Sequence, residues 1–213
     1  MDGLDILKKD WQKDNTAYPK HSYNEIYKMI LKKSSSIVKW IFIISLLEFV
    51  FWTLISFFLK DTKSMQRFEQ FDADTILIPL AIIGYVVLAY FFYIFFRNYR
   101  TISATDNAKV LMENILKTRR AVKQYVGFNL IYLVIATVVV LFIEFDQDQQ
   151  LINQAQQASA NGDVFKFYAT IIITTAIFLA IAIGLLLLFY WLVYGILLGR
   201  LNKNYTELKK LEV

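Results

Sequence analysis

Residues 37–59 read IVKWIFIISLLEFVFWTLISFFL, and this stretch decides the fold. It is almost wholly apolar and holds one carboxylate, Glu48, near its middle. As an α-helix it would rise about 35 Å, which is enough to cross a hydrocarbon core of about 30 Å with some tilt. The stretch is therefore predicted to be a transmembrane helix.

Three more apolar runs of spanning length follow, at residues 75–96, 125–145 and 168–198. The chain of 213 residues is 57% hydrophobic and only 19% charged, which is outside the range of a soluble domain. The sequence predicts an all-α polytopic membrane protein with four transmembrane helices in two hairpins. The first run starts too deep in the chain for a secretory signal peptide, so we expect it to stay embedded in the lipid bilayer.

The basic residues predict the orientation. Of the 23 lysines and arginines, 19 lie in residues 1–39, 97–124 and 199–213. The two short loops, 60–74 and 146–167, carry the other four. Loops rich in Lys and Arg stay in the cytoplasm, so the sequence predicts that both termini are cytoplasmic.

Residues 1–36 are predicted to form cytoplasmic amphipathic helices. Leu4, Leu7 and Trp11 recur at helical spacing among charged residues. Three interpretations are open for this first helix: it lies on the membrane surface, it docks a cytoplasmic protein, or it packs on this chain's own cytoplasmic loop.

A second helix is expected to start after it. Ser22 and Glu25 have the spacing of a capping box, and Tyr23 and Tyr27 share one face of the predicted helix. A turn into the first span is expected near residues 34–36.

The cytoplasmic loop 97–124 is predicted to be helical from a cap at Ser103 or Thr105. No helix breaker separates it from the third span, so one rod of about 40 residues, near 60 Å, is expected. The outer loop 146–167 is rich in Gln and Ala; a helical extension and a disordered loop remain alternatives.

Glu48 is the residue on which a functional site is predicted. Ser45 shares its helical stripe, which should face the other helices because lipid cannot satisfy a carboxyl group. Inserting a charged residue at the centre of a transmembrane helix costs about 2.5–3.5 kcal/mol, while each Leu, Ile, Phe or Val contributes about 0.3–0.6 kcal/mol in favour of insertion. The hydrogen-bond partner expected for Glu48 is a tyrosine hydroxyl or a nearby amide, with these candidates: Tyr85, Tyr132 and Asn129. A structural contact that fixes helix register and a step in proton or cation transport are the alternatives.

Small residues recur at spacings of four in the last apolar run. Such residues let helices approach closely, either within the chain or between copies in a homo-oligomer. The set comprises Ala176, Ala180, Gly184, Gly195 and Gly199.

The composition excludes several kinds of chemistry. The chain has no cysteine and a single histidine, His21, so thiolate metal sites and multi-histidine iron or haem sites are excluded. No phosphate-binding loop or catalytic triad pattern occurs. We therefore predict no catalytic residues, metal, cofactor or nucleic-acid partner.

Three segments resemble a group of small four-span bacterial inner-membrane proteins, often encoded beside extracytoplasmic-function sigma factors. They are residues 4–14, LDILKKDWQKD; residues 23–45, YNEIYKMILKKSSSIVKWIFIIS; and residues 103–120, SATDNAKVLMENILKTRR. Some members are labelled carotenoid oxygenases, which the single histidine contradicts. The resemblance implies a bacterial inner-membrane regulator in which residues 1–33 act as an anti-sigma segment, although they are short for one and lack the zinc-binding Cys/His pattern.

The leading functional hypothesis from the sequence is a non-enzymatic membrane protein that binds a cytoplasmic protein partner. Its predicted contacts are Leu4, Leu7, Trp11, Tyr23 and Tyr27, with the helix over 106–120 as a second surface. Two alternatives are a transport or channel component that uses Glu48 and a structural subunit of a membrane complex.

Overall fold

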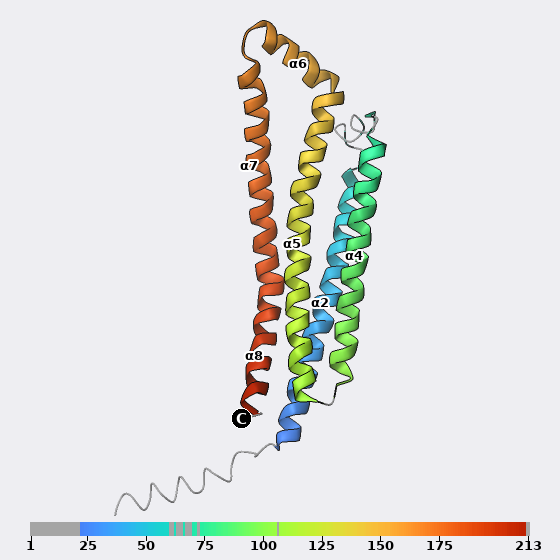
Figure 1. Ribbon diagram of the computed structural model, residues 1–213, viewed down its shortest axis with the longest axis vertical. Helices are drawn as coiled ribbons and strands as arrows, with labels where there is room; N and C mark the ends of the chain where they lie inside the picture. The colour runs from blue at the N-terminus through green and yellow to red at the C-terminus, as the bar shows by residue number, and fades with distance from the viewer. Residues whose placement is uncertain are drawn as a thin grey trace, which may run out of the picture.

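The computed structural model describes residues 22–59, 73–105 and 107–211, together with residues 62, 66, 70 and 71. These residues form long helices, and no strand occurs among them. Four helical stretches are long and apolar enough to cross a membrane, which confirms the predicted all-α, four-span fold. They run alternately up and down as two hairpins, with the start of α2 and the end of α8 at the same end (Figure 1). The elements are α2 (Tyr23–Leu59), α4 (Asp74–Ser103), α5 (Ala108–Gln147), α6 (Gln149–Ala160), α7 (Val164–Tyr190), η1 (Trp191–Gly195) and α8 (Ile196–Leu211).

Helix α2 begins with the predicted capping box. The backbone N–H of Ser22 donates to Glu25 Oε2 at 3.0 Å, and the N–H of Glu25 donates to Ser22 Oγ at 3.3 Å. The turn expected near residues 34–36 is absent, because α2 continues through them to Leu59. Ser34 instead lies buried inside the protein, where its hydroxyl accepts a hydrogen bond from Asn204 Nδ2 of α8 at 2.9 Å.

Helix α5 is the predicted rod, 40 residues long. Its N-cap is Asn107, whose Oδ1 accepts from the N–H of Lys109 at 2.8 Å and more weakly from Val110 at 3.5 Å. This corrects the prediction that Ser103 or Thr105 caps the helix. Thr105 is buried in the connection, and its carbonyl accepts from the Tyr27 hydroxyl of α2 at 3.2 Å.

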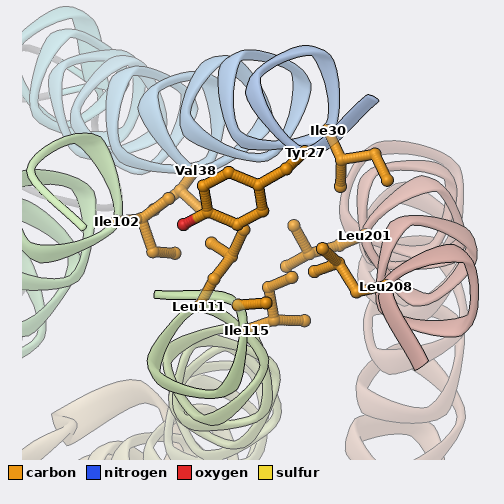
Figure 2. Packing of buried hydrophobic residues seen from close by; sticks show 9 residues of the cluster. Tyr27, Ile30, Val38, Ile102, Leu111, Ile115, Leu201 and Leu208 are labelled. Carbon is orange, nitrogen blue, oxygen red and sulfur yellow. The ribbon is translucent and has the colours of Figure 1, made fainter. Parts of the chain in front are cut away.

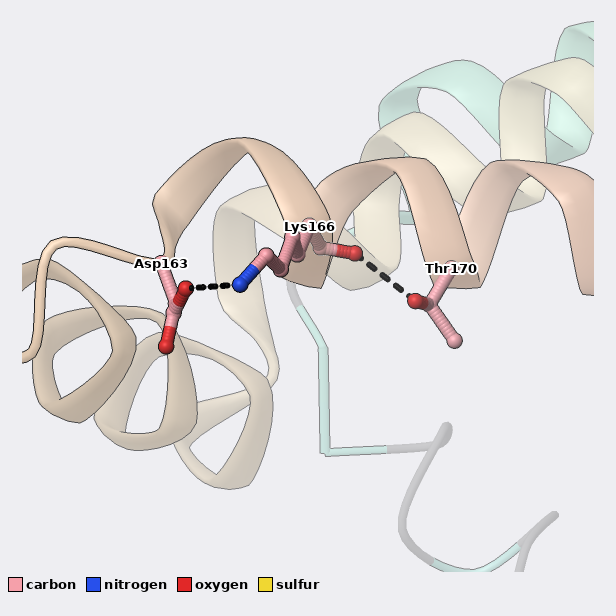
Figure 3. Close-up of polar contacts among 3 residues, drawn as sticks. All are labelled: Asp163, Lys166 and Thr170. Atoms are coloured by element: carbon pink, nitrogen blue, oxygen red, sulfur yellow. Dashed lines mark hydrogen bonds and ion pairs between the residues drawn. The ribbon is translucent and has the colours of Figure 1, made fainter.

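The second hairpin turns through the short helix α6. Asp148, in an extended conformation, ends α5 and caps α6 by accepting from the N–H groups of Gln150 and Leu151. Gly162 has a φ of +76°, which lets the chain reverse into α7. Lys166 pairs with Asp163 at 2.8 Å at the start of α7, and its carbonyl accepts from Thr170 (Figure 3).

The ends of α2, α4, α5 and α8 that lie beside the start of α2 and the end of α8 pack into one apolar core, which we call the terminal bundle (Figure 2). The side chains of Leu111 and Ile115 from α5 are fully buried there against α2 and α8. One side of the predicted rod therefore forms a wall of this bundle, while its other side, with Lys109, Glu113 and Lys117, is exposed. The buried members of the terminal bundle are Tyr27, Ile30, Val38, Ile102, Ala108, Leu111, Ile115, Leu201 and Leu208.

Candidate functional site

Glu48 lies inside the protein, with its carboxyl group held by tyrosines. The Tyr190 hydroxyl donates to Glu48 Oε1 at 2.6 Å. The hydroxyls of Tyr125 and Tyr194 donate to Oε2 at 2.9 Å and 3.3 Å. All four side chains are buried, so the carboxyl group has exchanged water for three phenol groups. We call Glu48 and its three partners the tyrosine cage.

The cage joins three separate parts of the chain. Tyr125 comes from α5, Tyr190 is the last residue of α7, and Tyr194 lies in the π-helical turn η1. Tyrosines four positions apart project from the same side of a helix. A π turn inside an α-helix is rare and is found often at functional sites, and this one begins directly after Tyr190.

An aromatic shell surrounds the cage. The ring of Tyr125 lies edge-on to Phe91 and Phe95 of α4, with ring centroids 5.5 Å and 5.6 Å apart. It also contacts the rings of Tyr190 and Tyr194, at 6.4 Å and 6.1 Å. Such edge-to-face pairs fix ring orientation. Helix α4 thus positions the cage without contributing a hydrogen bond to Glu48.

The cage joins the middle of the first span to the ends of spans three and four that lie nearer the terminal bundle. Glu48 follows Lys39 by nine residues, or about 13 Å of helix. Tyr194 precedes Arg200 by six residues, or about 9 Å, and Tyr125 follows Lys123 by two. The carboxyl group is therefore separated from the basic ends of the spans by only a few helical turns.

Two cavities meet at Glu48. The inner cavity, about 290 Å³, lies between α2, α4 and α5 and is lined by Glu48, Gly84, Asn129 and Tyr132 among others. The second cavity, about 640 Å³, lies between α2 and α7; we call it the lateral groove. Glu48 and Trp52 line both.

The polar partners predicted for Glu48 lie elsewhere. Tyr132 donates to the Leu80 carbonyl at 3.2 Å and lies across Gly84, where a Cβ would meet its hydroxyl at 2.8 Å. Asn129 donates to the Tyr125 carbonyl at 3.0 Å, and Tyr85 is largely exposed. The prediction of a tyrosine hydroxyl as the partner of Glu48 is therefore confirmed in kind, whereas the three named candidates are corrected.

Ser45 is buried as predicted for its stripe, but it does not reach Glu48. Its hydroxyl donates to the Phe42 carbonyl one turn earlier, at 2.8 Å. A serine that bonds its own helix in this way is a structural feature and brings no second polar group to the carboxyl site.

The small residues of the last span do not pack within the chain. Ala176, Ala180, Gly184 and Gly199 are exposed, and a Cβ on either glycine would touch nothing within 4 Å. A Cβ on Gly195 would meet only Trp191 of its own turn. The prediction of close packing inside the chain is thereby corrected, because the side of α7 that contacts α5 is offset from this stripe.

The predicted partner-binding residues differ in whether they are exposed and in whether the structure describes them. Tyr27 is buried in the terminal bundle, which corrects its prediction as a partner contact, whereas Tyr23 is exposed. Leu4, Leu7 and Trp11 lie outside the described residues.

The chemistry available at the cage is that of one carboxyl group. No cluster of metal-ligating side chains occurs among the residues that the structure describes. An ionised carboxylate has about four acceptor positions on its two oxygens, and the tyrosines use three. The group can therefore bind one more donor or cation.

Comparison of the sequence with known proteins identifies the family of this chain. No curated protein and no solved structure matches this chain. One family model, described as Domain of unknown function (DUF8845), matches residues 24–213, which include all four spans and the tyrosine cage. The chain belongs to this family.

Proposed function

We propose that the protein is a proton-coupled membrane transport component in which Glu48 takes up and releases the proton. The observation that supports this function best is the tyrosine cage, in which one intramembrane carboxyl group accepts hydrogen bonds from α5, α7 and η1. Ionisable groups inside a membrane are costly and usually mark ion pathways or proton relays. We rank transport above the partner-binding function because the cage is a formed polar site, whereas among the predicted partner contacts Tyr27 is buried in the terminal bundle.

The cage supports coupling between protonation and movement. A carboxylate accepts all three hydroxyl donors, whereas a protonated carboxyl group has its own O–H to place and accepts less strongly. The titratable groups that face Glu48 are Tyr125, Tyr190 and Tyr194, and the residues that α4 contributes to this region are apolar, Phe91 and Phe95 among them. Protonation of Glu48 therefore weakens the links that hold α7 and η1 to α2.

The membrane and orientation form part of the proposal. Four apolar helices support a membrane protein, and the excess of Lys and Arg near the termini supports placing the terminal bundle in the cytoplasm. With that orientation, Tyr125 and Tyr194 lie at the cytoplasmic ends of spans three and four, while Glu48 lies near the middle of span one. We propose the inner membrane of a bacterium, as the sequence resemblance implies.

Proton flux into reconstituted vesicles tests this function. Proteoliposomes loaded with a pH-sensitive dye should acidify under an imposed inside-negative potential faster than protein-free vesicles. Glu48→Gln should reduce the rate of acidification to that of protein-free vesicles, because the amide side chain of glutamine is not a titratable group. Glu113→Gln, which removes an exposed charge in the terminal bundle, should keep the wild-type rate. Equal rates for wild type and Glu48→Gln would contradict the proposal.

A second candidate function, a subunit of a membrane complex, is favoured by the exposed small-residue stripe of α7. Ala176, Ala180 and Gly184 lie on one exposed side of a helix whose apolar window has no buried residue. Because the chain has no cysteine, Ala180→Cys gives one cross-linking site. Disulfide-linked dimers in native membranes with Ala180→Cys, but not with the buried Ala121→Cys, would support assembly through this side. Absence of cross-links would count against it.

A further inference from the structure

We propose that the lateral groove binds a lipid-soluble organic cation, with Glu48 as its counter-charge. This inference rests on the proposed transport function and names the chemical class of its substrate: an apolar body of drug-like size that carries a single positive charge. Three features of the groove support this ligand: its size and apolar lining, the carboxyl group of Glu48, and its opening toward lipid.

The groove is large and apolar. Its volume of about 640 Å³ falls within the range of about 300–1,000 Å³ that is typical of small-molecule sites. One wall is formed by α2, with Leu47 and Phe51, and the other by α7, with Leu185 and Phe189. Sites of this type fix their ligand with a few polar groups set in an apolar wall, and here that polar group is Glu48.

When it is ionised, Glu48 carries a charge that no side chain of the groove balances. The side chains that line the groove and the inner cavity, in the described part of the chain, include no lysine or arginine. Tyrosine hydroxyls solvate the carboxylate but do not neutralise it, and an isolated buried charge is costly. A cation bound in the groove offsets that cost by placing a positive charge beside the carboxylate.

Aromatic side chains next to the carboxyl group also favour a cation. Phe51, Trp52 and Phe189 line the groove around Glu48. The face of an aromatic ring attracts positive charge, and Trp does so most strongly. An anion would be repelled by both the carboxylate and the rings. A small metal ion would find too few oxygen ligands, since Ca²⁺ takes six to eight and Mg²⁺ requires six.

The groove opens sideways, so its ligand can enter from the bilayer. Its edges are formed by strongly exposed side chains, with Leu47 59% and Leu185 64% exposed. Apolar side chains exposed at this level of a spanning helix face lipid tails. A ligand that enters here must be soluble in lipid, which requires a large apolar body or a charge spread over one.

Two ions of nearly equal shape and opposite charge test the proposal. Tetraphenylphosphonium is a lipid-soluble cation and tetraphenylborate is its anionic counterpart. Their binding to the full chain in nanodiscs is measured by equilibrium dialysis, with empty nanodiscs subtracted. We expect saturable binding of the cation and none of the anion. Glu48→Gln should weaken cation binding at least about tenfold, whereas Glu113→Gln should leave it unchanged.

A second variant keeps the test valid if Glu48→Gln does not fold. Ala182→Trp fills the groove from α7 but lies outside the tyrosine cage. It should abolish cation binding while Glu48 and its partners stay intact. Equal binding of the two ions, or cation binding that neither variant reduces, would overturn the proposal.

The outcomes separate this inference from the proposed function. Cation binding that depends on Glu48, without proton flux, would retain the site and reject transport. Proton flux that depends on Glu48, without cation binding, would retain transport and reject this class of substrate. Movement of tetraphenylphosphonium driven by an imposed pH gradient would support both.

Discussion

Replacing each tyrosine of the cage by phenylalanine should destabilise the protein in an order set by hydrogen-bond length. Each substitution removes one hydroxyl and leaves the ring, so packing changes little. The distances to the Glu48 oxygens are 2.6 Å for Tyr190, 2.9 Å for Tyr125 and 3.3 Å for Tyr194. Short hydrogen bonds to charged groups are the strongest. The predicted order of destabilisation is Tyr190→Phe, then Tyr125→Phe, then Tyr194→Phe.

The size of the effect reports the charge of the carboxyl group. Hydrogen bonds to charged groups contribute about 1.5–3 kcal/mol, whereas hydrogen bonds between helices in a membrane average about 0.6 kcal/mol. The short contact from Tyr190 predicts a loss of about 1.5–3 kcal/mol for Tyr190→Phe if Glu48 is ionised. The long contact of Tyr194 predicts a loss nearer 0.6 kcal/mol.

The free energy of unfolding in bicelles, measured by steric trapping or by denaturation in a graded series of detergent mixtures, tests this order. Tyr168→Phe is the matched control on α7, because the Tyr168 ring packs against Phe145 and Phe167 and is remote from Glu48. It should change the unfolding free energy by less than about 0.5 kcal/mol. Equal effects for Tyr190→Phe and the control would refute the reasoning.

Three further substitutions test the packing around the site and the terminal bundle. Gly84→Ala places a Cβ 2.8 Å from the Tyr132 hydroxyl and should cost about 1–3 kcal/mol by unfolding, whereas Gly127→Ala, where a Cβ meets nothing within 4 Å, should not destabilise. Ile115→Ala empties a fully buried position and should cost about 2–5 kcal/mol; a loss below 1 kcal/mol would indicate that the terminal bundle does not form. Asn107→Ala removes the N-cap of α5 and should cost about 1 kcal/mol, with faster amide hydrogen exchange in its first turn; unchanged exchange there would contradict the cap.

The number and type of the spans could be predicted from the sequence, because apolar length alone decides which helices cross a membrane. The capping box at Ser22 and the 40-residue length of α5 followed from equally local signals. Glu48 was recognisable as the candidate site residue because a carboxylate in an apolar run is energetically exceptional.

The partners of Glu48 could not be predicted, because they depend on how far each helix extends along its neighbours. The expectation of Tyr132 and Asn129 assumed that the midpoints of the spans lie at one depth. Helices α5 and α8 instead extend well beyond the apolar runs into the terminal bundle, which brings the ends of spans three and four to Glu48. The one available signal was the spacing of Tyr190 and Tyr194, two hydroxyls four positions apart in an otherwise apolar run.

The π turn and the outward direction of the small-residue stripe of α7 also could not be predicted from the sequence. A π turn shifts the helical register by one residue and leaves no composition signal in residues 191–195. The recurrence of Ala176, Ala180 and Gly184 indicates a helix face of small side chains, but it does not indicate whether this chain or another molecule packs against that face.

We propose that Glu48 is a carboxyl group inside the membrane that is reachable from lipid. Labelling intact membranes with a lipid-soluble carbodiimide or with a water-soluble one, followed by mass spectrometry of each carboxyl site, tests this most directly. We expect Glu48 to react with the lipid-soluble reagent only, and the exposed Glu113 to react with the water-soluble one. Reaction of Glu48 with the water-soluble reagent at the rate of Glu113 would contradict the claim.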